Sequence, residues 1–189
     1  MKLHEGYYWP DGTTHYPSLD ALADVQRWLK YVTVFGSAVQ AGGNCGLFPL
    51  ELAKHFRAVY TAEPDAENFA CLAANCIEAN VYQFRAALGS AHRTVGLEHH
   101  SDNIGAHRIS SAGDIPMLRI DDLALKDCGL IALDVEGGEL EALEGALETL
   151  EQHPVVAWER TRGKLGVIRF LEKRGYQFAE RVGIDEIWV

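Results

Sequence analysis

From residue 35 onward, apolar positions along the chain follow two alternating spacings. Short continuous apolar runs, typical of buried strands, alternate with stretches in which apolar residues recur every three or four positions, as on one helix face. The runs predict strands at 35–41, 58–62, 81–87, 130–135 and 155–158, and two closing strands at 176–180 and 185–189. The spaced stretches predict helices at 47–56, 66–79 and 165–174, and one helix with Leu140, Leu143, Leu147 and Leu150 on one face.

This alternation predicts an α/β fold: a Rossmann-like doubly wound sheet of seven strands, mostly parallel, with helices on both faces. Only a short link at Gly183 separates the closing strands, so we expect an antiparallel terminal hairpin at the sheet edge. No repeat or linker divides the chain. Residues 1–189 are therefore predicted to form one domain, with an N-terminal lead-in and helix (1–30) and a core (31–189).

Two regions lack a clear period. Residues 1–17 are rich in aromatic side chains, and we expect them to be an irregular lead-in to a short helix that Ser18 caps. Residues 90–117 hold four of the eight histidines together with many turn residues. We expect that this second region is the place for an extra hairpin over the sheet edge.

Composition narrows the choice of partners and compartment. The formal net charge is -10, and an acidic surface repels phosphate backbones, so we expect no nucleic-acid partner. No window approaches the roughly 20 apolar residues of a membrane span, and the first residues lack the apolar core of a signal peptide. The four cysteines form no CxxC pair. We therefore expect reduced thiols, no membrane association and a cytoplasmic location, while the sequence carries no signal for an oligomeric state.

The residues with chemical potential follow the predicted strands. Ligands of an open parallel sheet bind at the carboxyl ends of its strands. Here those ends carry the glycine-rich turn 42–46 and the carboxylates Glu63, Asp134 and Glu159. Glycine lets backbone approach a ligand closely, and Glu63, about twenty residues further on, is placed to accept the hydroxyl protons of a ribose. The turn lacks the GxGxxG spacing of a pyrophosphate site, which favours a phosphate-free nucleoside cofactor such as S-adenosylmethionine over NAD.

Five motifs in this order resemble the FkbM family of methyltransferases. They are 39–48 (VQAGGNCGLF), 63–65 (EPD) with Asn68-Phe69, 86–89 (AALG), 120–123 (IDDL) and 133–139 (LDVEGGE), and the resemblance covers about residues 36–160. It implies a class I methyltransferase fold and transfer of the methyl group of S-adenosyl-L-methionine, typically to a hydroxyl oxygen. One departure is Gln40, because the first strand of the family usually ends in an acidic residue. The amide oxygen of Gln40 is still expected to accept a hydrogen bond from the cofactor's ammonium, without a charge.

The resemblance also implies roles for single residues. Gly42, Gly43 and Asn44 would line the methionine part of the cofactor, Glu63 would hold its ribose, and Ala87 and Leu88 would flank its adenine. Asp134 and Glu136 would face the reaction cleft. The implied cofactor-binding set is Gln40, Gly42, Gly43, Asn44, Glu63, Pro64, Ala87, Leu88 and Asp134.

The spacing of Asp134 and Glu136 predicts catalysis by one of the two. Residues two apart at a strand end point to the same face, and neighbouring carboxylates raise at least one pKa towards neutrality, which suits a general base. Glu139 is interpreted as favourable charge at a helix start, and Asp121-Asp122 as a helix cap. Glu159, and Asp11 with His15 if the lead-in folds back across the sheet, are the candidates for contacts with the acceptor.

A metal site is not expected. The neighbouring pair His99-His100 and the single His107 could supply metal ligands, but no third ligand falls at a diagnostic spacing along the chain. The predicted function is therefore S-adenosylmethionine-dependent O-methylation of a hydroxyl group on a small molecule or sugar. The alternative, which Gln40 favours, is a non-catalytic binding or scaffold protein that keeps the fold. An NAD-dependent oxidoreductase would require the missing GxGxxG.

Overall fold

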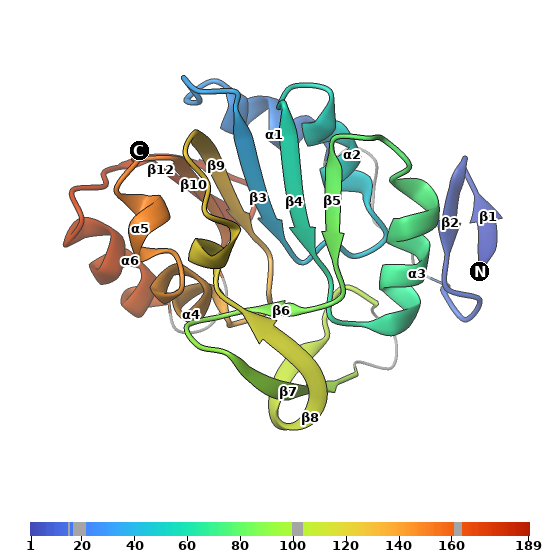
Figure 1. The fold of residues 1–189 in the computed structure, drawn as a ribbon. Coiled ribbons are helices and arrows are strands. Elements are labelled where there is room, and N and C mark those ends of the chain that lie inside the picture. Colours follow the sequence, from blue (N-terminus) through green and yellow to red (C-terminus); the bar gives the residue numbers. More distant parts are fainter. Residues whose placement is uncertain (15, 17–21, 100–103, 161–163) are drawn as a thin grey trace.

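A seven-stranded sheet forms the centre of the computed structural model, which describes residues 1–14, 16, 22–99, 104–160 and 164–189 (Figure 1). The strand order is β11-β12-β10-β9-β3-β4-β5. The parallel strands are β3 (Ser37–Ala41), β4 (Ala58–Ala62), β5 (Val81–Phe84), β9 (Cys128–Leu133) and β10 (Val155–Glu159). The closing pair, β11 (Phe178–Val182) and β12 (Asp185–Trp188), is antiparallel, and β12 is also antiparallel to β10. The predicted sheet and its terminal hairpin are confirmed.

Helices cover both faces of this sheet. On one face lie α1 (Leu22–Leu29), α2 (Leu47–Ala53) and α3 (Ala66–Asn75), whose Val25, Leu52 and Leu72 belong to one buried cluster with strand residues. On the other lie α4 (Glu139–Glu144), α5 (Leu147–Leu150) and α6 (Lys164–Glu172), whose Leu143 and Leu171 belong to a second cluster. Apolar side chains on both faces of the central strands thus anchor a doubly wound core.

Some predicted boundaries are wrong. The single helix expected through Leu150 is divided at Gly145, where a Cβ would lie 2.0 Å from the carbonyl oxygen of Gly89, so the backbone can pass only without a side chain. The strand expected at 130–135 ends at Leu133, and the strand expected at 81–87 is divided into β5 and a short β6 (Ala87–Leu88). Periodicity marks these elements but does not fix the residues at which they end.

A second, three-stranded sheet lies across the carboxyl ends of β3, β4 and β5 (Figure 1). It has the order β6-β8-β7, with β7 (Arg93–Glu98) and β8 (Arg108–Leu118) antiparallel. Its own buried side chains, Ala87, Val95, Ile115 and Met117, form a separate small cluster. The extra hairpin expected within 90–117 is present, and it covers the edge of the main sheet at which ligands bind.

The sequence suggested an irregular lead-in, but the structure shows a regular one. Strands β1 (Lys2–His4) and β2 (Tyr7–Trp9) form a hairpin whose turn residues Glu5 and Gly6 both have positive φ, as the tightest hairpin turns require. Trp9 is buried against Cys45 and Cys71, and the backbone of Tyr8 is hydrogen-bonded to Asn75 at the end of α3. Burial of one aromatic residue thus orders the segment. The predicted cap Ser18 and the candidate His15 lie outside the described residues.

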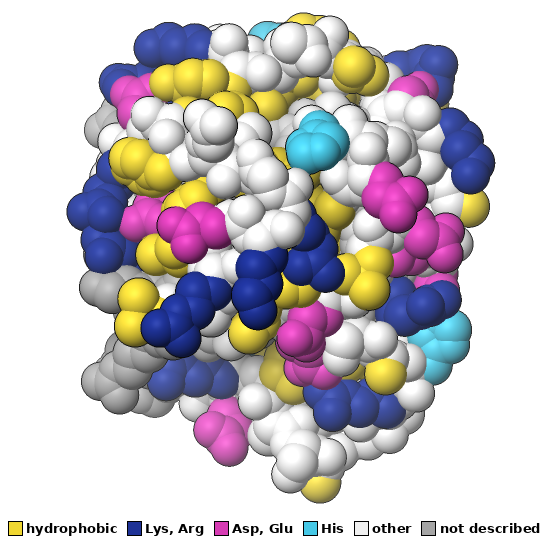
Figure 2. Space-filling view, turned by 90° about the vertical axis from the view of Figure 1, so that its left-hand side faces the viewer, with side chains coloured by type: hydrophobic (Ala, Val, Ile, Leu, Met, Phe, Trp, Pro, Cys, Tyr) yellow, Lys and Arg dark blue, Asp and Glu magenta, His cyan; other side chains and the backbone are white. Residues whose placement is uncertain are grey.

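The helices, the cysteines and one face of the surface can be compared with the expectations drawn from composition. Among the described residues, no helix is long and apolar enough to cross a bilayer. All four cysteines are buried and free of disulfides. On the face that Figure 2 turns toward the viewer, acidic and basic side chains are both present, and several basic ones lie side by side across the middle of the face.

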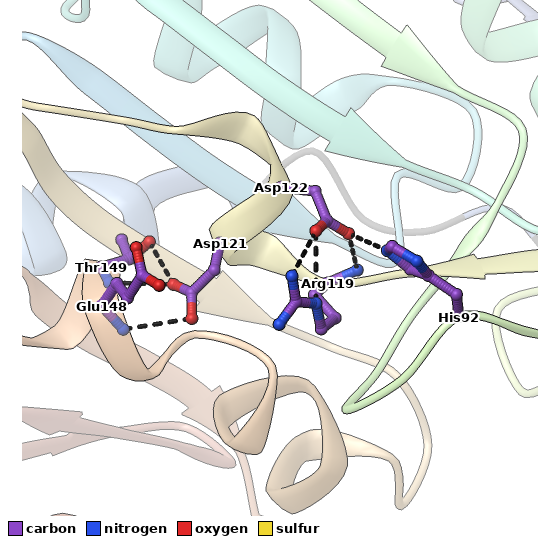
Figure 3. Close-up of polar contacts among 6 residues, drawn as sticks. All are labelled: His92, Arg119, Asp121, Asp122, Glu148 and Thr149. Carbon is purple, nitrogen blue, oxygen red and sulfur yellow. Dashed lines mark hydrogen bonds and ion pairs between the residues drawn. The ribbon is translucent and has the colours of Figure 1, made fainter.

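Asp121 and Asp122 are structural caps, as their sequence indicated (Figure 3). Asp121 accepts hydrogen bonds from the backbone N–H groups of Glu148 and Thr149 at the start of α5, and from the Thr149 hydroxyl. Asp122 accepts from the backbone and guanidinium of Arg119 and lies 2.6 Å from Nε2 of His92. Burial raises the pKa of Asp122, but these hydrogen bonds outweigh it and lower that pKa to about 2. Asp121 thus joins the 3-10 turn at 120–123 to the start of α5, whereas Asp122 stabilises the turn itself and contacts His92.

Candidate active site

The glycine-rich turn after β3 is shaped by contact with β9. Gly42 has φ +83, and a Cβ there would lie 1.8 Å from the carbonyl oxygen of Asp134. A Cβ on Gly43 would lie 2.4 Å from Cδ1 of Leu72. The sequence interpretation reserved this space for a ligand. The protein itself occupies it, so these glycines are needed first for packing, and the turn then presents its remaining backbone to the cavities beside it.

Glu63 lies at the end of β4 with its carboxylate held by two backbone amides. One oxygen accepts from the N–H of Asn44 at 2.7 Å, and the other accepts from the N–H of Asp65 at 2.8 Å. The residue is only 5% exposed. Burial raises the pKa of Glu63 to about 7, although both backbone hydrogen bonds favour the charged form. The side chain of Asn68 also hydrogen-bonds to Glu63, so the carboxylate is oriented before any ligand arrives.

A cavity with about 700 Å³ of empty space, open mouth included, lies in front of Glu63. It is enclosed by the strand ends on one side and by β6, β8 and the segment before β8 on the other. Most of the predicted cofactor-binding set lines it, namely Gly42, Asn44, Glu63, Pro64, Ala87, Leu88 and Asp134. The wall also includes Asn68, Ile104, His107 and Met117, which the sequence analysis did not single out for this site.

Two residues that line this cavity, Asn44 and Asn68, each have a buried acceptor atom. Oδ1 of Asn44 and Oδ1 of Asn68 are shielded from water and have no hydrogen-bond partner among the described residues. A buried polar atom without a partner costs about 1–3 kcal/mol, so such atoms normally meet a water or a ligand. Together with Glu63 they make the cavity rich in acceptors, which suits a ligand with several hydroxyl or amino donors.

Gln40 stabilises the turn from within. Its side-chain amide donates to the carbonyl oxygens of Gly42, at 2.9 Å, and Ala41, at 3.2 Å, while its oxygen accepts from the Thr61 hydroxyl at 2.7 Å. It lines a second cavity together with Gly43, not the one in front of Glu63. A carboxylate here would have no donor for the two carbonyls, which is a physical reason for an amide at this position.

The second cavity, with about 1090 Å³ of empty space including its opening, adjoins the first. Gly42, Asn44, Asp134 and Glu136 line both, so the two cavities meet at the end of β9. Aromatic side chains of the second cavity are Trp28, Phe48 and Trp158, and its carboxylates are Asp24, Asp134, Glu136, Glu159 and Asp185. No Lys or Arg among the described residues lines it.

Three carboxylates meet where the cavities join. Oxygens of Asp134, Glu136 and Glu159 all lie within 4.8 Å of one another. Asp134 is open to the cleft but enclosed by protein on its other sides. This enclosure, followed by Glu159, Asp185 and last Glu136, raises the pKa of Asp134 well above its usual range. The sequence argument paired Asp134 with Glu136, whereas Glu159 from the neighbouring strand is the stronger influence.

The geometry of Glu136 also differs from the expected one. It lies beyond the end of β9 with φ +52, a left-handed conformation that is rare for this residue type. Its carboxylate reaches the cluster through this turn and not through strand alternation, and it lies 3.9 Å from Nη2 of Arg108. Glu139 is buried and accepts a hydrogen bond from the N–H of Gly137 at the start of α4, a structural position.

The structure separates the residues expected at the acceptor. Glu159 lines the second cavity. Asp11 lines neither cavity; it is exposed and pairs with the N-terminal amine of Met1 at 3.0 Å. His15 lies outside the described residues.

The sequence analysis missed Asp185. It stands opposite Glu159 in the antiparallel pair β10–β12, and burial, followed by Asp24 and Glu159, raises the pKa of Asp185 to about 7. The only sequence signal for it is a carboxylate at the start of a strand predicted to run antiparallel at the edge.

Comparisons with known proteins show the family of this chain. Residues 44–178 match the family described as the methyltransferase FkbM domain. No curated protein matches the chain in sequence. A solved structure of methyltransferase FkbM from Methylobacillus flagellatus KT is similar, with a TM-score of 0.60 and 19% identity. The match covers 82% of this chain but 44% of that one, so this chain spans less than half the length of that relative.

Two other solved structures share the fold at lower identity. A precorrin 8w decarboxylase from Methanobacterium thermoautotrophicum has a TM-score of 0.58 and 11% identity, over 97% of this chain and 90% of that one. An rRNA methylase from Streptococcus thermophilus has a TM-score of 0.56 and 11% identity, over 88% and 92%. These two show the architecture only. The family match spans most of the chain, and the chain therefore belongs to the FkbM methyltransferase family.

Proposed function

We propose that this protein is an S-adenosyl-L-methionine-dependent O-methyltransferase that acts on a hydroxyl group of a small molecule or sugar. The observation that carries the proposal is the buried Glu63 carboxylate, held by two backbone amides and directed at a cavity that continues into a second, carboxylate-lined cavity. The first cavity would hold the cofactor and the second the acceptor, and Asp134 would stand between them.

The first cavity fits the cofactor in its chemistry. The two oxygens of the Glu63 carboxylate suit the two hydroxyl groups of a ribose. The Oδ1 atoms of Asn44 and Asn68, which have no partner among the described residues, are further acceptors for hydroxyl, amino or ammonium groups. Ala87 and Leu88 offer an apolar wall for a purine ring. When bound, S-adenosylmethionine supplies a methyl group that its positively charged sulfonium makes electrophilic.

Asp134 is the group proposed to take the acceptor's proton. A hydroxyl is a poor nucleophile until its proton is being removed, and a base with a pKa near the working pH removes it best. The carboxylate of Asp134 lines both cavities, and its raised pKa gives it this character. Glu159 and Asp185 keep the pKa high by their proximity, so they act as positioning residues around the base.

The acceptor is proposed to be hydroxylated and free of phosphate. Carboxylates line the second cavity without a facing Lys or Arg among the described residues, so an anionic acceptor or a nucleic acid would be repelled. The rings of Trp28 and Phe48 are stacked, with centroids 5.6 Å apart, and flat aromatic faces suit the apolar face of a sugar ring. Four buried free thiols favour a reducing compartment, and we place the protein in the cytoplasm as part of this proposal.

The non-catalytic alternative rested on Gln40. Since the Gln40 amide holds two carbonyl groups of the turn, its presence has a structural reason and does not by itself favour loss of activity.

Titration calorimetry with S-adenosylmethionine and S-adenosylhomocysteine tests the cofactor. Binding of both, with a higher melting temperature, is the expected result, and absence of binding at millimolar concentration would contradict the proposal. The acceptor class is then tested with radiolabelled cofactor and a panel of neutral polyols, sugars, phosphorylated sugars and amines. Transfer to neutral hydroxyl compounds is expected; exclusive transfer to amines or phosphorylated compounds would overturn the O-methyl assignment.

A further inference from the structure

Two histidines and an aspartate that are distant in sequence meet beside the first cavity. Asp65 caps α3, His99 directly follows β7 and His107 directly precedes β8. One ligand-type atom of each lies within 4.8 Å of the others. The sequence analysis dismissed a metal because no third ligand follows the histidines at a diagnostic spacing. In the structure, however, a third candidate ligand lies beside the histidines: Asp65, which precedes His99 by 34 residues along the chain.

The two oxygens of Asp65 have separate tasks. Oδ1 accepts the N–H groups of Glu67 and Asn68 and so caps the helix. Oδ2 is directed at the histidines and lies 2.8 Å from Nε2 of His99. The helix cap therefore locks the carboxylate in place with one oxygen toward the pair of imidazoles. In metal sites, the residues that bind the ion are usually held in place in this way by hydrogen bonds to neighbouring groups.

The imidazoles of His99 and His107 lie close together, edge to face. The ring centroids of His99 and His107 lie 4.7 Å apart and the ring planes are inclined by 64°. In a tetrahedral zinc site with bonds near 2.0–2.1 Å, neighbouring ligand atoms are about 3.3 Å apart. The donor atoms observed within 4.8 Å thus need to move by about 1.5 Å or less to close around an ion. His99 is 62% exposed in its side chain, which leaves room for that movement.

We propose that Asp65, His99 and His107 bind a divalent first-row transition metal, with Zn²⁺ the best fit and water completing its coordination. Two imidazoles and one carboxylate are the donor set that such ions prefer, whereas Mg²⁺ prefers oxygen donors alone. The bound ion would join the two sides of the β7–β8 connection to the start of α3, next to the cavity wall to which His107 belongs. This proposal does not depend on methyl transfer.

Another histidine–carboxylate pair in the chain shows the contrast. His92 lies 2.6 Å from Asp122, but the guanidinium of Arg119 already occupies that carboxylate (Figure 3). A cation there would be repelled by Arg119, so His92 is a matched control for an imidazole beside a carboxylate. The cluster of Asp134, Glu136 and Glu159 offers oxygen donors only and provides a second control.

The experiment is a Zn²⁺ titration of the chelator-treated full chain in competition with a chromogenic chelator and in excess Mg²⁺. Binding of one Zn²⁺ per chain is expected, and Co²⁺ in its place should give the visible absorption of a low-coordinate nitrogen and oxygen site. His99→Ala and His107→Ala should each weaken binding at least tenfold. Asp65→Asn, which keeps a good helix cap, should weaken it as well. His92→Ala and Glu159→Gln should leave the affinity unchanged.

Any of three results would overturn the proposed metal site. The first is an absence of Zn²⁺ binding in excess Mg²⁺, and the second is an unchanged Zn²⁺ affinity in both His99→Ala and His107→Ala. The third is a loss of Zn²⁺ binding in Glu159→Gln while the two histidine variants still bind Zn²⁺ normally. Circular dichroism of each variant separates loss of ligand from loss of fold. Cofactor titration of the same variants is a separate readout, so failure of the metal site and failure of the proposed cofactor site are distinguishable.

Discussion

Binding of S-adenosylmethionine should be linked to the loss of a proton from Glu63. In the absence of ligand the pKa of Glu63 is about 7, because the residue is buried. A ribose diol needs two acceptors, so the cofactor should bind the ionised carboxylate better than the acid. At pH 8 the group is mostly ionised, and at pH 6 it is mostly protonated. The affinity should therefore fall about tenfold between pH 8 and pH 6, since the ionised fraction falls by that factor.

Glu63→Gln is the matching perturbation. Both oxygens of Glu63 accept a backbone N–H, so either rotamer of glutamine places its NH₂ group against the amide of Asn44 or of Asp65. The variant also loses the charge that strengthens the hydrogen bonds to the ribose, worth about 1.5–3 kcal/mol. We expect cofactor affinity at pH 8 to drop roughly ten- to a hundredfold, with no further change down to pH 6.

Calorimetry in two buffers of different ionisation enthalpy counts the protons released. At pH 7 about half a proton should leave the wild-type protein on binding, because about half of Glu63 is protonated there. Asp134→Asn is the control, since the pKa of Asp134 is also raised and it lines the same cavity. If Glu63→Gln kept the wild-type affinity at pH 8, or kept the pH dependence while Asp134→Asn lost it, the reasoning about Glu63 would be refuted.

Three further predictions concern catalysis and stability. Asp134→Asn should lower kcat by about 10²–10⁴-fold, the usual worth of a general base, with a small change in cofactor affinity; equal losses in both would point to a binding role. Asp185 has a folded pKa of about 7, above its unfolded value, so its contribution to stability is present below pH about 4 and is lost as pH rises through 7. Asp185→Asn should therefore flatten the fall in melting temperature between pH 5 and pH 8, and an unchanged slope would contradict this. Gly42→Ala should destabilise the fold by several kcal/mol, because the new Cβ would overlap the carbonyl oxygen of Asp134. Gly12→Ala is the control: the space around Gly12 is open, so this variant should melt like the wild type. Similar melting temperatures for both variants would show that the turn can relax.

The sequence by itself determined the layers of the fold and the edge at which the site lies. A strand that is buried on both faces has a continuous apolar run, and a helix that is buried on one face has apolar residues every three or four positions. Both patterns can be recognised in a short stretch of the sequence. Since consecutive parallel strands end at the same edge, Gly42, Glu63 and Asp134 had to come together once the sheet was recognised. No long-range information was needed for that step.

Only the tertiary structure decided which side chains complete the site. Asp185 meets Glu159 through the register of the antiparallel pair β10–β12, and Asp65 meets His99 and His107 because a hairpin folds across the carboxyl edge of the sheet. The role of Gly42 likewise depends on the close approach of β9. Periodicity reports which face of an element is buried, but it does not report strand register or the path of a loop, because these depend on contacts between residues far apart in the chain.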